Sequence, residues 1–142
     1  MSYDLSTLTN FAYNYEIKPE NLPIHFCDEP YTRTSISRNE DMEVVLVCFR
    51  EGQTSSVHNH QGSNCVVRVV KGKLLETLYK EDVPGELAFY HQHYLRKGDI
   101  SGLDGEAIHQ LTNLSKDGTV LLNFYSPPFD MQVFSSDSSE IG

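Results

Sequence analysis

Two histidines separated by one residue are the first candidates for chemistry in this chain. His58 and His60 lie in the stretch SSVHNHQGSNCVV, and Cys65 follows five residues after His60. If this segment is a strand, side chains two residues apart leave from the same face, so both imidazoles could reach one metal ion. The spacing is weak evidence by itself, because His91 and His93 repeat it elsewhere in the chain.

Flanking glycines and a later histidine distinguish the first pair from the second. Gly52 and Gly72 enclose the first pair, whereas Gly98 precedes His109 by ten intervening residues and Asn113 follows after three more. This double pattern resembles the two metal-binding motifs of the cupin superfamily, which are small jelly-roll barrels. In that family the first motif supplies two histidines and a glutamate, and the second motif supplies a third histidine.

The resemblance makes His58, His60 and His109 the metal ligands and places Cys65 at the position of the motif glutamate. Three neutral imidazoles would leave a divalent ion its full charge and about three open coordination positions. Imidazole suits iron, copper, zinc and nickel, so the ligand type alone does not name the metal. The other pair lacks this frame and is flanked by tyrosines, which favours solvent-edge or packing roles for it.

Short β-like stretches, separated by turn residues, dominate the chain from residue 43 onward. Strands are predicted at Glu43–Phe49, Ser55–His60, Cys65–Val70, Leu74–Tyr79, Ala88–Leu95, Ala107–Leu111, Thr119–Tyr125 and Met131–Phe134. Only the first thirty residues could hold helix, and two prolines keep any helix near residues 21–30 short. The predicted fold class is all-β, a sandwich, jelly roll or small barrel.

We expect a single domain over residues 1–142, with a cupin barrel core at about 31–134 and a polar, disordered tail at 135–142. The net charge of −9 and the lack of a Lys/Arg cluster argue against nucleic-acid binding. The apolar runs are too short for a membrane span, and the N-terminal stretch is not typical of a secretory signal. Three cysteines cannot all pair within one chain, which favours reduced thiols and a cytoplasmic location. We also expect a monomer.

Two longer stretches, SSVHNHQGSNCVVRVVKGKLLETLY and LLNFYSPPFD, resemble the cysteine dioxygenases, the thiol dioxygenase family of cupins. The resemblance runs from about Tyr31 to about Phe134, and several motifs agree in order and spacing. It implies a mononuclear Fe(II) site, with the three histidines as ligands, that oxidises the thiol of L-cysteine to a sulfinate with O₂.

The stretch YTR at residues 31–33 resembles the clamp for the substrate carboxylate in that family. It implies that Tyr31 and Arg33 bind substrate, since a planar guanidinium suits bidentate contact with a carboxylate. Related enzymes for 3-mercaptopropionate carry glutamine at the arginine position, so Arg33 favours cysteine.

The resemblance also implies catalytic roles for Cys65 and Tyr125. In the mammalian type, a thioether joins the cysteine at this position to the tyrosine. The same stretch implies a cis bond between Ser126 and Pro127. Cys27 and Cys48 are interpreted as small buried hydrophobic residues.

Three positions depart from the mammalian pattern. Leu121 and Asn123 replace a serine and a histidine that relay hydrogen bonds to the tyrosine, and Phe49 stands where a tryptophan often lies. Asn123 can still donate to or accept from the substrate, but it carries no charge near neutral pH.

These departures leave other functions open. The thiol could be 3-mercaptopropionate, cysteamine or homocysteine instead of cysteine. A cupin that senses cysteine without turnover, or one with another metal-dependent chemistry, are further alternatives. The sequence also leaves open whether the product enters taurine synthesis or breakdown to pyruvate and sulfite.

Overall fold

Strands dominate the structure, a computed structural model that describes residues 2–27, 31–128 and 132–133. The elements in chain order are α1 (Leu5–Asn14), η1 (Pro19–Asn21), β1 (Thr32–Arg38), β2 (Glu43–Phe49), β3 (His58–Asn59), β4 (Asn64–Lys71), β5 (Lys73–Val83), β6 (Glu86–Arg96), β7 (Ile100–Leu103), β8 (Ile108–Asn113), β9 (Thr119–Ser126) and β10 (Gln132–Val133). The all-β prediction and the short helical N-terminal segment are confirmed.

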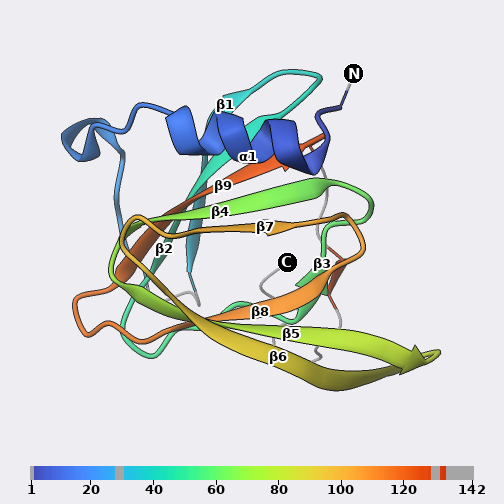
Figure 1. The fold of residues 1–142 in the computed structure, drawn as a ribbon. Helices are drawn as coiled ribbons and strands as arrows, with labels where there is room; N and C mark the ends of the chain where they lie inside the picture. Colours follow the sequence, from blue (N-terminus) through green and yellow to red (C-terminus); the bar gives the residue numbers. More distant parts are fainter. Residues whose placement is uncertain (1, 28–30, 129–131, 134–142) are drawn as a thin grey trace.

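The strands form two five-stranded sheets that face each other in a jelly roll (Figure 1). One sheet has the order β1-β2-β9-β4-β7, and the other has the order β10-β3-β8-β5-β6. Neighbouring strands are antiparallel throughout, and the first sheet's inner face meets the second sheet across an apolar core.

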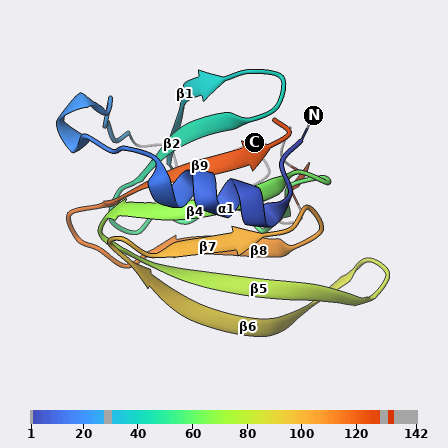
Figure 2. The ribbon, with the colours of Figure 1, turned by 45° about the horizontal axis from the view of Figure 1, so that its top comes forward.

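The central strands β2 and β9 are buried on both faces, which explains their continuous apolar sequence. On β9, Leu121 and Tyr125 face the other sheet, whereas Leu122 and Phe124 belong to a second core under the helix. Figure 2 shows α1 lying across the outer face of this sheet. The helix therefore covers the side of the sheet that would otherwise face water.

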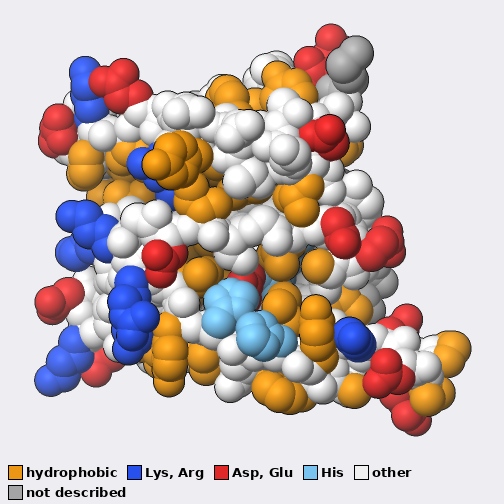
Figure 3. Space-filling view, viewed as in Figure 1, with side chains coloured by type: hydrophobic (Ala, Val, Ile, Leu, Met, Phe, Trp, Pro, Cys, Tyr) orange, Lys and Arg blue, Asp and Glu red, His pale blue; other side chains and the backbone are white. Residues whose placement is uncertain are grey.

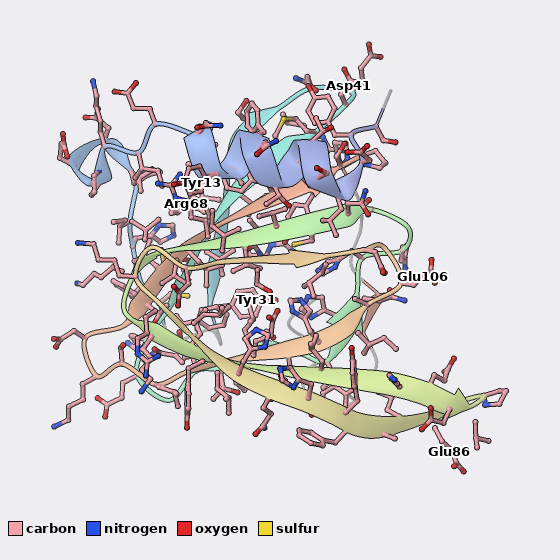
Figure 4. The ribbon with its side chains drawn as sticks, viewed as in Figure 1. Tyr13, Tyr31, Asp41, Arg68, Glu86 and Glu106 are labelled. Atoms are coloured by element: carbon pink, nitrogen blue, oxygen red, sulfur yellow. The ribbon has the colours of Figure 1, made fainter. Side chains whose placement is uncertain are left out.

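Both ends of α1 are tied down by side chains. The Asp4 carboxylate accepts a hydrogen bond from the Thr7 amide at 2.8 Å, which caps the N-terminus. Arg68 on β4 donates to the carbonyl oxygens of Ala12 at 2.7 Å and Tyr15 at 2.9 Å, beneath the other end of the helix (Figure 4). A cation at this end also opposes the negative pole of the helix dipole.

The predicted strands occur in the structure, with changed limits. The strand predicted at Ser55–His60 pairs only over His58–Asn59, and the hairpin of β5 and β6 is longer than predicted. The sequence analysis did not predict β1 or β7, the two edge strands of the first sheet. The predicted tail at 135–142 lies outside the described residues.

Among the described residues, no helix has the length and apolar character needed to cross a membrane. The single-domain organisation, the monomeric state and the cytoplasmic location stay predictions.

Candidate metal centre

The three predicted histidine ligands come together between the sheets. His58 on β3 pairs directly with His109 on β8, and His60 follows β3 by one residue. One nitrogen from each ring lies within 4.8 Å of the other two, and all three side chains are buried. Within the described part of the chain, these histidines form the single group of His, Cys, Asp or Glu side chains with this geometry.

Close contact between two loops helps to place the ligands. The Gly62 amide, just after His60, donates a hydrogen bond to the Gly105 carbonyl at 3.1 Å. A Cβ atom at Gly105 would overlap the backbone of Gly62, so glycine permits this approach. The loop after β3 is thereby held against the loop that leads into the strand of His109.

The outer ring nitrogens direct the inner ones toward a common point. His58 Nδ1 donates to the Ser56 carbonyl, and His109 Nδ1 donates to Glu76, each at 2.8 Å. The two Nε2 atoms then lie 3.0 Å apart. Burial lowers the pKa of His58 to about 3 and holds that of His60 well below its usual range. Neutral imidazoles with inward lone pairs are suitable donors for a divalent transition metal.

Glu76 on β5 adds a buried carboxylate beside this donor set. Its Oε2 accepts from His109, and its Oε1 accepts from Ser101 Oγ and from His93 Nε2, both at 2.7 Å. Burial alone would raise the pKa of Glu76, but the hydrogen bond from His109 and the electrostatic interaction with its ring lower it to about 2. A negative charge therefore lies next to the imidazoles, although the motif glutamate itself is absent.

Glu76 was not predicted as a site residue, although the pattern of β5 contains a signal for it. Leu74, Glu76 and Leu78 alternate along β5, so one inward-facing position carries a charge between two apolar side chains. A charged residue on a buried face needs a partner, and here the partner is a candidate metal ligand.

A small cavity of about 20 Å³ is lined by one of the three histidines and by the predicted substrate residues. Tyr31, Arg33, Asn123 and Tyr125 line it together with His58. Figure 4 shows Tyr31 between the two sheets. Arg33 lies on the edge strand β1 and is exposed, with its guanidinium directed inward to Tyr125.

The Tyr125 hydroxyl oxygen contacts two other residues that line this cavity. Asn123 Nδ2 donates to it at 2.8 Å, and Arg33 Nη2 approaches it at 3.4 Å. Burial raises the pKa of Tyr125 far above its usual range, so the phenol keeps its proton at neutral pH. Asn123 thus keeps one hydrogen bond to the Tyr125 hydroxyl at the position where the mammalian pattern has a histidine. Leu121, at the position of the serine, packs in the apolar core.

The comparison with protein families decides the identity of this arrangement. The family model for cysteine dioxygenase type I matches residues 4–137. The chain belongs to this family. The cysteine dioxygenase type 1 of cattle (Bos taurus) is 30% identical over 123 residues, covering 82% of this chain and 62% of that protein. The chain therefore spans less than two thirds of the length of this relative.

Solved structures show the same fold at low sequence identity. A double-stranded β-helix protein from Klebsiella pneumoniae has a TM-score of 0.67 and 16% identity, covering 84% of this chain and 92% of that one. An RmlC-like cupin from Shewanella frigidimarina has a TM-score of 0.59 and 20% identity, covering 81% of this chain and 92% of that one. The cupin jelly roll predicted from the sequence is thus confirmed.

The two residues that form the thioether in mammalian-type cysteine dioxygenases are direct neighbours here. Cys65 on β4 stands opposite Tyr125 on β9 in the antiparallel register, so both side chains leave from the same face. Both are buried in the core between the sheets, and burial raises the pKa of the Cys65 thiol. Cys48 is also buried, whereas Cys27 is half-buried.

The second histidine pair lies on β6. His91 is exposed there, as expected of a solvent-edge residue, but His93 is half-buried and bonded to Glu76.

Two further positions singled out in the sequence lie at or near the cavity. Phe49 packs against Tyr31 with ring centroids 5.0 Å apart and lines the cavity. The bond between Ser126 and Pro127, directly after Tyr125, is cis, as predicted.

Proposed function

We propose that this chain is an iron-dependent thiol dioxygenase that converts L-cysteine to cysteine sulfinate. The observation that carries the proposal is the convergence of three buried imidazoles beside a cavity lined by Arg33 and Tyr125. When held by His58, His60 and His109, iron(II) would supply the redox chemistry that places both atoms of O₂ on one sulfur.

The residues around the cavity would bind and orient the substrate. Arg33 would hold the carboxylate, and Tyr31 would support it from the start of β1. The Asn123 amide and the Tyr125 hydroxyl would face the reacting end with groups that stay uncharged at neutral pH. A cavity of about 20 Å³ has room for roughly one water molecule, so the thiol would enter as the exposed Arg33 side chain moves aside.

A panel of thiols would test the proposal. Protein loaded with Fe(II) without oxygen is expected to consume one O₂ for each cysteine sulfinate formed, and chelated protein is expected to consume none. Oxygen uptake and mass spectrometry of the product, with cysteamine, 3-mercaptopropionate and homocysteine in parallel, would identify the preferred thiol. Absence of oxygen uptake with every thiol would refute the enzyme, and tight cysteine binding without turnover would favour a sensor.

We also propose that Cys65 and Tyr125 become joined by a thioether during turnover. A carbon–sulfur bond would form as the thiol hydrogen and one ring hydrogen leave as two protons and two electrons, with O₂ as the electron acceptor. The intact protein should then weigh less by two hydrogen atoms, and reductant should not reverse this loss.

Variants at both residues make this mass measurement specific. Cys65→Ser and Tyr125→Phe are each expected to abolish the mass loss, whereas Cys48→Ser should leave it unchanged. If Cys65→Ser or Tyr125→Phe still weighs less by two hydrogen atoms, the hydrogens come from elsewhere in the chain.

A further inference from the structure

Glu76 is held by hydrogen bonds on both of its carboxylate oxygens. His109 donates to Oε2 at 2.8 Å, while His93 and Ser101 both donate to Oε1 at 2.7 Å. The side chain has no exposed surface. With both oxygens occupied, the carboxylate cannot rotate without breaking a charge-assisted bond in the protein interior.

These bonds bring together four strands from both sheets, because His109 lies on β8. Glu76 on β5 and His93 on β6 stand opposite each other in one sheet, and Ser101 comes from β7 at the edge of the other sheet. Figure 3 shows two adjacent histidine side chains at this surface of the molecule. His91 and His93 lie on β6 with ring centroids 5.3 Å apart. His93 has 32% of its side chain exposed, so the chain of contacts runs from solvent to a candidate metal ligand.

The orientation of His109 depends on this carboxylate. The Glu76 carboxylate accepts a hydrogen bond from Nδ1 of His109, which leaves Nε2 for the metal. Outer partners of this kind fix the ring of a ligand and raise its basicity, and their loss weakens metal affinity. If the donor from His93 is lost, Oε1 retains the Ser101 bond and the carboxylate gains freedom to turn.

We propose that His93 is a positioning residue of the metal centre, which acts through Glu76 to fix His109. This inference rests on the metal site of the proposed function and adds a residue at the protein surface to it. The metal affinity and the ligand field of the bound ion then depend on a side chain that touches neither metal nor substrate.

Cobalt(II) titration of the full chain tests this inference without reference to activity. His93→Leu removes the donor to Glu76 and is expected to weaken Co²⁺ binding by about tenfold, the lower end for lost outer partners. The visible absorption of the bound Co²⁺ should shift as the His109 ring moves. His93→Gln restores an N–H donor and should recover most of the affinity and the spectrum.

Two further variants separate positioning from general effects. His91→Leu changes the neighbouring histidine on the same strand, which stands opposite Leu78 and not opposite Glu76. This variant should bind Co²⁺ as the unchanged protein does. Glu76→Gln keeps the shape but removes the charge, and its binding should weaken by up to about a hundredfold.

The outcomes are distinguishable. If the unchanged protein binds Co²⁺ and His93→Leu has the same affinity and spectrum, this inference is wrong while the proposed metal site stands. An equal loss of Co²⁺ affinity in His91→Leu would also overturn it, because replacing any histidine on this surface would then have the same effect. If the unchanged protein binds no metal at all, both the proposed function and this inference fail. Far-ultraviolet circular dichroism confirms that each titrated variant is folded.

Discussion

Replacing His109 with alanine is expected to abolish metal binding and to lower thiol-dependent oxygen uptake by at least about a thousandfold, since a metal centre supplies several kcal/mol of rate acceleration. His58 and His60 come from β3 and its end, whereas His109 comes from β8. Its loss leaves ligands from one segment only. Metal content after gel filtration and oxygen uptake with L-cysteine measure the two effects.

A second variant separates the loss of metal from damage to the fold. His109→Ala also removes a donor from the buried Glu76, at a cost of about 1–3 kcal/mol for the unsatisfied group. His58→Ala removes a ligand whose outer nitrogen bonds to a backbone carbonyl, so Glu76 keeps its partners. Both variants should lose the metal. In the presence of chelator, His109→Ala should melt at a lower temperature than His58→Ala. Stoichiometric metal in His109→Ala would contradict the proposed centre.

The central strands could be predicted because their sequence reflects burial directly. The runs EVVLVCF and TVLLNFYS are apolar at almost every position, and the structure buries both faces of β2 and β9. The sequence could not show that α1 covers the outer face. That arrangement depends on contacts such as those of Leu8 and Ala12 with the sheet, between residues far apart in the chain.

The two edge strands of the first sheet, β1 and β7, could not be predicted for a physical reason. The sequence TRTSISR of β1 is mostly polar, since an edge strand has solvent along one side and few apolar contacts to make. The strand β7 has only four residues and includes Gly102. Local composition thus identified strands rich in apolar and aromatic residues more readily than these two edge strands.

Some residues of the candidate site could be predicted from the sequence, and others could not. The three histidines could be assigned because their spacing and glycine frame resembled known motifs, whereas His91 and His93 had the same spacing and no frame. Glu76 carried no motif. Its importance arises from the register of β5 with β6 and β8, which places it diagonally across from His109.

Replacing Arg33 with glutamine is expected to lower kcat/KM for L-cysteine by about 10–100-fold, since each charged hydrogen bond to a carboxylate contributes about 1.5 kcal/mol or more. The free energy of each bond is taken at the low end of its range because Arg33 is exposed on β1, where water weakens its interactions. Cysteamine lacks the carboxylate, so its kcat/KM should change little. Initial rates of oxygen uptake with both thiols measure the difference in specificity.

Arg38→Gln is the matched control for this substitution. Arg38 lies at the other end of β1 and bonds to Glu43 at 3.2 Å, and it does not line the cavity. Its kcat/KM values should equal those of the unchanged protein with both thiols. Equal losses with cysteine and cysteamine in Arg33→Gln would contradict the carboxylate clamp. Because Arg33 also approaches the Tyr125 hydroxyl, such a result would place its effect on the phenol and not on the substrate.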